Sequence, residues 1–215
     1  MKYKITIIIQ LMAIIALFNC RLTAQNWDIR MLEKINGNPN QFLKGYSTFI
    51  SESTTAVSIG VPAVLGISAL ITHDDEMLKN TLYIGAAQAV DGILTLTLKR
   101  TLNRPRPYAT YPDLIEPYRF SLEHSFPSGH TSLAFSTATA LSLKYPKWYI
   151  IAPSYVWATS VGYSRMNLGV HYPTDVIAGA VLGAGSAYLT LLINDWHREK
   201  KVNKKLLTLE LYSGL

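Results

Sequence analysis

Charged side chains and cysteine are scarce in this sequence. Lys, Arg, Asp and Glu together make up 16% of its 215 residues, whereas roughly a quarter is usual in soluble domains. Hydrophobic residues account for 49%, and this balance favours a membrane protein. Cys20 is the single cysteine, so a disulfide within the chain is excluded.

Sequence patterns that bind metals or nucleic acids are also missing. The sequence has no carboxylate cluster and no Cys/His spacing typical of a metal site, so we predict neither a metal nor another cofactor. The formal charge is +6, but the cations are not interleaved with aromatic residues as in nucleic-acid-binding segments. We expect no nucleic-acid partner. The sequence does not specify an oligomeric state.

The N-terminal segment has the pattern of a secretory signal. Two lysines precede an apolar run at 5–18, and Ala24 offers a cleavage point. The same segment could remain as a first membrane helix, although about 14 apolar residues are short for a span. We interpret 1–24 as a signal peptide or a first membrane helix, and 25–215 as one domain.

Beyond this segment, the hydrophobic pattern is helical. Residues 26–53 alternate charged and apolar positions, which suits one or two amphipathic helices broken at 37–39. Five apolar segments follow, and each is long enough, or nearly so, to cross a membrane. We therefore predict an all-α fold, a bundle of five to six transmembrane helices preceded by an amphipathic segment. The five apolar segments are 54–72, 80–98, 125–143, 148–164 and 176–194.

These apolar segments are also rich in small and polar residues, which leaves a soluble helical bundle as an alternative. Gly179 and Gly183 have the four-residue spacing that lets membrane helices pack closely. Asp91 is the only acidic residue within the five segments and should face the bundle interior with a partner. We interpret Asp91 as structural, and a role in tuning a nearby site is the alternative.

The distribution of Lys and Arg predicts the orientation. With a cytoplasmic N-terminus, the 144–147 connection and the tail after residue 194 lie in the cytoplasm, and both are rich in cations as the positive-inside rule requires. The segments 99–126 and 163–175 then share the periplasmic side with the amphipathic N-terminal segment. A cleaved signal and a retained first helix give the same orientation. The cations in these outer segments oppose the rule, as expected if they serve chemistry.

Three polar clusters lie in the outer segments, and 164–175 contains the first. Pro173 suits the first turn of a helix, and Asp175 in that turn interacts favourably with the helix dipole. Asp175 lies close enough to hold one ring nitrogen of His171, which leaves the other free to attack or to accept a proton. Arg165 adds a fixed cation. Taken alone, this cluster also fits an ordinary helix start beside surface charges.

The second cluster, residues 127–130, reads Pro-Ser-Gly-His and opens an apolar run. Small residues at a helix start let an anion approach backbone N–H groups. The third cluster, residues 99–107, ends an apolar segment with four cations. Taken alone, the second cluster fits helix punctuation, and the third fits a basic helix end that faces lipid headgroups.

In chain order the clusters read Lys-x6-Arg-Pro, Pro-Ser-Gly-His and Ser-Arg-x5-His-x3-Asp. This composite resembles the three-part signature of the type 2 phosphatidic acid phosphatase (PAP2) superfamily. That superfamily includes bacterial lipid phosphatases, class A acid phosphatases and vanadium haloperoxidases. Every signature position between Lys99 and Asp175 is matched. The resemblance makes 25–215 a PAP2-like phosphatase domain.

The resemblance also implies a role for each matched residue. His171 would be the nucleophile that forms a phosphohistidine, Asp175 would orient it, and His130 would protonate the leaving oxygen. Arg104 repeats the Arg-Pro pair two residues early, and we choose Arg106 as the ligand. A cage of donors stabilises the charge of a phosphoryl group in transfer, and the scheme needs no metal. The phosphoryl oxygens would be held by Lys99, Arg106, Ser128, Gly129 and Arg165.

The loop 108–126 joins two of the clusters and is rich in Tyr, Pro and acidic residues. It could cover the entrance used by the substrate headgroup. Glu123 and His124 could assist in binding, and a polar loop at the membrane surface is the simpler interpretation of both.

The expected function is metal-independent hydrolysis of a lipid phosphomonoester or pyrophosphate at the periplasmic face of a bacterial inner membrane. The membrane and a phosphorylated lipid are the expected partners. The signature reads only the phosphoryl group, so it does not choose among undecaprenyl pyrophosphate, phosphatidylglycerol phosphate, phosphatidic acid and lipid A phosphates. Three alternatives share the signature: a soluble periplasmic acid phosphatase, a vanadate-holding haloperoxidase and a lipid-binding relic without activity.

Overall fold

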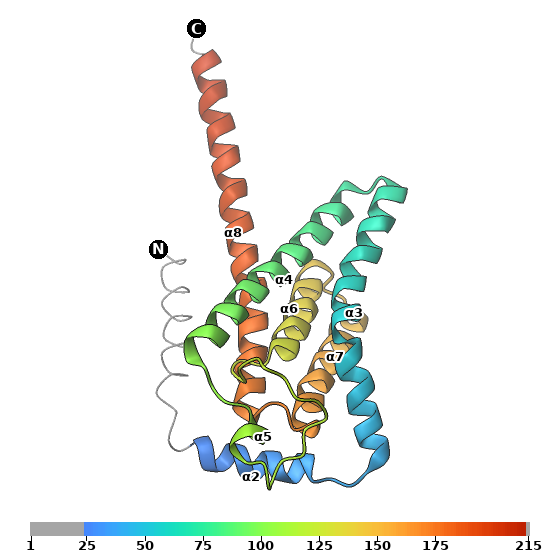
Figure 1. The fold of residues 1–215 in the computed structure, drawn as a ribbon. Helices are drawn as coiled ribbons and strands as arrows, with labels where there is room; N and C mark the ends of the chain where they lie inside the picture. Colours follow the sequence, from blue (N-terminus) through green and yellow to red (C-terminus); the bar gives the residue numbers. More distant parts are fainter. Residues whose placement is uncertain (1–23, 214–215) are drawn as a thin grey trace.

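The computed structural model describes the backbone of residues 24–213 (Figure 1). The predicted signal peptide or first membrane helix at 1–24 lies outside the described residues, apart from Ala24 itself. Within the described range the fold is all-α, as predicted, and no strand occurs there. Its helices are α2 (Ala24–Asn36), α3 (Gln41–Thr72), α4 (Asp75–Leu102), α5 (Pro107–Thr110), α6 (Gly129–Lys144), α7 (Trp148–Asn167) and α8 (Pro173–Ser213).

The amphipathic N-terminal segment forms α2 and the beginning of α3. The predicted break at 37–39 separates the two helices, and the Asn40 side chain caps α3 by accepting a hydrogen bond from the Leu43 N–H. The second predicted amphipathic helix is not separate, because α3 continues without interruption from Gln41 into the apolar segment. α2 lies across one end of the bundle, next to α5 (Figure 1).

Two left-handed residues end the first long helices. His73 (φ 55°) closes α3, and the Asp74 side chain then accepts hydrogen bonds from Glu76 N and Met77 N at the start of α4. These caps make α3 and α4 an antiparallel hairpin (Figure 1). Asn103 (φ 47°) ends α4 directly before Arg104, so the basic third cluster leaves the helix at the α2 end of the bundle.

The helix pair α6 and α8 packs closely at the predicted glycines. α6 packs on α8, α7, α4 and α3, which places it at the centre of the bundle (Figure 1). A Cβ atom at Gly179 would lie 2.6 Å from Ser128 O, and one at Gly183 would lie 2.0 Å from Ser132 O. Only glycine permits this approach of the two backbones.

Three described helical stretches are long and apolar enough to cross a membrane, namely Gln41–Thr72, Asp75–Thr110 and Pro173–His197. The predicted spans at 125–143 and 148–164 are not among them. α6 has only 16 residues, fewer than the roughly 20 that a span needs. α7 has 20 residues, but it mixes its aliphatic side chains with Tyr, Ser and Trp, which lowers its hydropathy.

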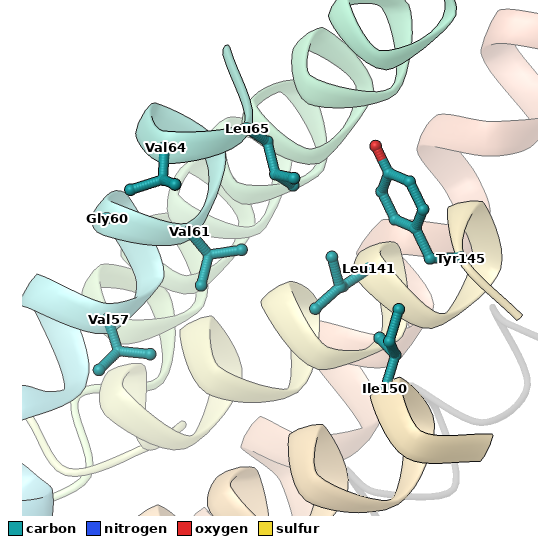
Figure 2. A pocket seen from close by; sticks show the side chains of 8 residues that line it. All are labelled: Val57, Gly60, Val61, Val64, Leu65, Leu141, Tyr145 and Ile150. Carbon is teal, nitrogen blue, oxygen red and sulfur yellow. The ribbon is translucent and has the colours of Figure 1, made fainter. Parts of the chain in front are cut away.

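An apolar pocket of about 670 Å³ lies between α3, α6 and α7 (Figure 2). Val57 and Leu65 of α3 face Leu141 near the C-terminal end of α6 and Ile150 near the start of α7. Its one side-chain polar atom is the hydroxyl of Tyr145, which is buried without a hydrogen-bond partner. The pocket lacks the cations that phosphate chemistry requires, so the candidate site lies elsewhere.

Candidate active site

The three polar clusters meet at the α2 end of the bundle. Residues 99–107 include the last turn of α4 and the segment after it, residues 127–130 span the start of α6, and residues 164–175 join the end of α7 to the start of α8. The two helix starts are tied directly, because Ser128 N–H donates to Asp175 O at 3.0 Å. α6 and α8 thus point their N-termini toward one place, where their exposed N–H groups favour an anion.

His171 lies in the turn between α7 and α8, and both of its ring nitrogens face chemically useful partners. Nδ1 is 3.5 Å from Asp175 Oδ2, and Nε2 is 3.4 Å from Arg106 Nη1. The side chains of His171 and Asp175 are 2% and 0% exposed. Burial lowers the pKa of His171 to about 3, and Asp175 opposes that shift. The imidazole is therefore neutral at pH 7 and has a nitrogen lone pair available.

Asp175 is held by more groups than the sequence pattern indicates. Its Oδ2 accepts hydrogen bonds from Ser125 Oγ at 2.5 Å and from Tyr172 N at 2.9 Å. Its Oδ1 accepts one from Arg104 Nη1 at 2.7 Å. The carboxylate is thus fully satisfied and fixed in orientation.

Lys99 and Arg106 are both 6% exposed and are anchored by backbone carbonyls. Lys99 Nζ donates to His124 O at 2.7 Å and is 3.7 Å from Glu123 Oε2. Arg106 donates to Glu123 O at 2.8 Å and to Val170 O at 3.0 Å. The carbonyls are neutral and orient both cations without cancelling their charge. The Glu123 carboxylate near Lys99 is largely exposed, which weakens that ion pair.

Arg165, near the end of α7, reaches the same region from the other side. It donates to Ser51 Oγ of α3, and its Nε is buried without a hydrogen-bond partner. A buried N–H without a partner is costly, so a bound phosphate oxygen would satisfy it.

Ser128, Gly129 and His130 form the start of α6. The Ser128 hydroxyl pairs with Thr131 Oγ1 at 2.8 Å and makes no side-chain cap. His130 is half-buried and lies within electrostatic range of Arg165, Arg106 and Lys99. The structure therefore brings all of the predicted site residues into one region.

Arg104 takes a different position from Arg106. Its guanidinium joins Asp175 to Asp28 of α2, at 2.7 and 2.8 Å respectively, whereas Arg106 is the arginine beside His171. The sequence analysis missed both Asp28 and Ser125 as contributors. Asp28 belongs to no motif. An amphipathic pattern alone does not reveal which charged residue of a helix becomes buried.

Three further residues, whose roles the sequence left open, have defined surroundings in the structure. Asp91 accepts a hydrogen bond from Ser132 of α6 and is buried, which agrees with a structural role between helices. The side chains of Glu123 and His124 are exposed. Their backbone carbonyls serve the site by orienting Arg106 and Lys99.

Known proteins resemble this chain in sequence and identify its family. Residues 80–199 match the PAP2 superfamily. An undecaprenyl-diphosphatase of Sulfolobus acidocaldarius is 30% identical over 95% of this chain and 98% of that protein. A lipid A 1-phosphatase of Rhizobium johnstonii is 31% identical over 52% of this chain and 46% of that protein.

Two crystal structures have the same fold. That of Aquifex aeolicus LpxE has a TM-score of 0.64 and 29% identity, covering 77% of this chain and 94% of that one. That of a transmembrane PAP2-type phosphatidylglycerolphosphate phosphatase from Bacillus subtilis has a TM-score of 0.71, covering 88% and 95%. Its 24% identity supports the fold alone.

Fold and relatives together define a multi-pass membrane phosphatase. The chain belongs to the PAP2 superfamily.

Proposed function

We propose that this chain hydrolyses a lipid diphosphate through a phosphohistidine on His171, without a metal, at the periplasmic face of a bacterial inner membrane. The observation that carries the proposal is the placement of His171. Nδ1 faces the fixed carboxylate of Asp175, and Nε2 faces the guanidinium of Arg106. A neutral imidazole held in this way can attack a phosphorus atom bound beside Arg106.

The reaction would then take two chemical steps at His171. In the first, the bond between Nε2 and phosphorus forms while the bond to the leaving oxygen breaks, and His130 gives that oxygen a proton. In the second, a water oxygen bonds to phosphorus while the bond between Nε2 and phosphorus breaks, and His130 takes a proton from the water. Inorganic phosphate leaves, and the neutral imidazole of His171 is restored. The negative charge of a bound phosphate favours the protonated form of His130 that the first step needs.

Lys99, Arg106 and Arg165 would stabilise the charge on the equatorial phosphoryl oxygens. Their positions are fixed before substrate binds, because carbonyls and Ser51 already hold them. Preorganised cations lower the barrier without a reorganisation cost during the reaction. Ser128 and Gly129 would add the N-terminal field of α6.

A diphosphate is proposed as the substrate for two reasons. The undecaprenyl-diphosphatase matches nearly the whole chain, and a further cation lies next to the phosphate cage. Arg119 is exposed, is 3.5 Å from Glu52 of α3 and lies within electrostatic range of Arg165. A second phosphate could displace Glu52 from this loosely held arginine.

The proposed orientation also includes α6 and α7 as membrane-crossing helices, because they pack between the three long apolar ones. Exposed aromatic residues occur at both ends of the bundle, as expected for two membrane surfaces. Trp148 and Tyr149 mark the end away from the site, and Trp27 and Tyr46 mark the site end. In this proposal, 25–215 is one phosphatase domain.

The test is phosphate release by detergent-purified protein in the presence of a chelator. The substrates are a polyprenyl diphosphate, a lipid monophosphate and a soluble phosphomonoester. We expect the diphosphate to be preferred, with turnover lost in His171→Ala and kept in His197→Ala, an exposed histidine far along α8. Turnover that survives in His171→Ala, or that needs a metal, would contradict the proposal. Equal cleavage of the soluble ester would favour an acid phosphatase.

A further inference from the structure

An aspartate outside the PAP2 signature is buried against the candidate site. Asp28 lies on α2 and is 0% exposed. Its Oδ2 accepts hydrogen bonds from Arg104 Nη2 at 2.8 Å and from Thr174 Oγ1 at 2.5 Å. Its Oδ1 accepts one from Thr174 N at 3.0 Å. A buried carboxylate with this many partners is held in one orientation.

Arg104 extends this contact to the catalytic segment. Its Nη2 binds Asp28, while its Nη1 binds Thr174 Oγ1 at 2.8 Å and Asp175 Oδ1 at 2.7 Å. The guanidinium carbon also lies 4.0 Å from the centre of the Tyr172 ring, which restricts its plane. The two ends of one rigid fork therefore connect α2 to the start of α8.

The two oxygens of Asp175 have different tasks. Oδ1 is bound by Arg104, and Oδ2 faces His171 Nδ1 at 3.5 Å. Because a carboxylate is planar, a partner that fixes Oδ1 also fixes the direction in which Oδ2 points. Arg104 thereby contributes to the orientation of the carboxylate that orients His171, together with the Ser125 hydroxyl and the Tyr172 N–H that bind Oδ2.

Charge balance explains why a second carboxylate is useful here. Arg104 and Asp175 alone would form a neutral pair, and the field of Asp175 on His171 would be weakened. Asp28 supplies the negative charge that balances Arg104, so that the three groups together keep a net charge of −1. An anion beside His171 stabilises the positive charge that develops on the imidazole when Nε2 bonds to phosphorus.

We propose that Asp28 is a positioning residue for phosphoryl transfer: acting through Arg104, it holds the Asp175 carboxylate toward His171. This role rests on the proposed function, and it assigns the support of the candidate site to one residue of α2, Asp28. α2 also has a second attachment that does not involve Asp175. Asn36 donates to Glu116 O at 3.0 Å and to Asn167 O at 2.9 Å.

These two attachments give matched variants for a test. Asp28→Asn removes the buried charge, Glu33→Gln removes the same charge from the exposed face of α2, and Asn36→Ala loosens the other attachment. If Asp28 positions Asp175, Asp28→Asn lowers kcat and the rate of phosphohistidine formation, with KM nearly unchanged. The expected loss is on the order of 10- to 100-fold, the range for removing a partner behind a functional ligand. Glu33→Gln and Asn36→Ala should stay within about twofold of wild type.

A double-mutant cycle separates positioning from simple docking of α2. Asp28→Asn should have little further effect in an Arg104→Gln background, because both changes break the same chain of contacts. The proposal would be overturned if the kcat losses of Asp28→Asn and Arg104→Gln multiplied in the double mutant. It would also be overturned if Asn36→Ala lowered kcat as much as Asp28→Asn does. Melting temperatures in detergent show whether each variant is folded.

Thr174→Val provides a milder variant if Asp28→Asn does not fold. It removes the hydroxyl that donates to Asp28 and accepts from Arg104, while keeping the charge of Asp28 and the shape of the Thr174 side chain. We expect a several-fold fall in kcat, and an unchanged kcat would overturn the proposal. Wild-type enzyme without His171-dependent turnover would refute the proposed function itself, whereas turnover that is insensitive to Asp28 and Thr174 would refute only the positioning role.

Discussion

Arg165 of α7 and Ser51 of α3 are hydrogen-bonded, and this contact turns the arginine toward the candidate site with its Nε unpaired. The contact joins two helices that are far apart in sequence. It leaves donors on the guanidinium free for a phosphate, since the serine takes one N–H and no carboxylate among the described residues forms an ion pair with Arg165. Ser51 belongs to no motif, and through this contact it would support Arg165, one of the proposed phosphate ligands.

Removing Arg165 should impair catalysis far more than removing its support. Arg165→Ala is expected to lower kcat/KM by about 10²- to 10³-fold, the cost of one preorganised donor to a developing anion. Ser51→Ala should cost less than about tenfold, because the arginine remains but is less ordered. Ser53→Ala is the matched control, since its hydroxyl bonds only to Ile50 O within α3. Equal kcat/KM for wild type and Arg165→Ala would contradict this assignment.

Arg119 should distinguish diphosphates from monophosphates. Its weak pairing with Glu52 is surface-exposed on both sides, so a second phosphate can compete for it. Arg119→Ala should raise KM for a polyprenyl diphosphate about tenfold and leave KM for the monophosphate nearly unchanged. Lys44→Ala removes another exposed cation, paired with Glu116 at 3.4 Å, and should change neither. A parallel rise in both KM values would show that Arg119 acts by general electrostatics.

The buried, neutral His171 should make the folded protein sensitive to acid. Its pKa is lowered to about 3 in the folded state, whereas an unfolded histidine titrates near 6.5. Between these two pKa values the unfolded chain binds more protons than the folded one. The contribution of neutral His171 to stability is therefore fully present above pH 6.5 and is lost as the pH falls below it. At pH 5 this group alone should account for a loss of about 2 kcal/mol.

The measurement is the melting temperature in detergent at pH 7 and pH 5, for wild type and His171→Asn. The wild-type midpoint should fall further on acidification, because the variant lacks the group whose protonation favours unfolding. Titrating groups that do not contact His171 are common to both proteins and cancel in the comparison. An equal fall would mean that His171 accepts its proton without leaving the folded state.

The cluster of candidate site residues was predictable from the sequence, because its members lie in short motifs with a fixed spacing. Lys99, His130 and His171 belong to short motifs at helix ends: Lys99 lies in the last turn of α4, His130 in the first turn of α6, and His171 just before the start of α8. The all-α fold followed from the apolar segments in the same way. The break between α2 and α3 at 37–39 could also be predicted, because Gly, Asn and Pro end helices through their own backbone preferences.

The supporting groups could not be found because their partners are distant in the chain. Asp28 meets Arg104 and Thr174 only after α2 has folded across the end of the bundle. Ser51 meets Arg165 only when α3 packs on α7. Hydrophobic patterning shows which face of a helix is buried, but not which polar residue at the edge of that face gains a partner.

The contact between α6 and α8 permits a last prediction, on stability. A Cβ at Gly183 would lie 2.0 Å from Ser132 O and 2.8 Å from Ser136 N, and these are backbone atoms that cannot move aside alone. Gly183→Ala should therefore separate the helices and lower the melting temperature strongly. Because Ser128 and Gly129 lie at the start of the same α6, activity should fall with the melting temperature.

At Gly185, two residues along α8, a Cβ would meet nothing within 4 Å, so Gly185→Ala should be neutral or stabilise the helix by up to about 1 kcal/mol. Equal melting temperatures for the two variants would show that the close approach of α6 and α8 does not contribute to stability.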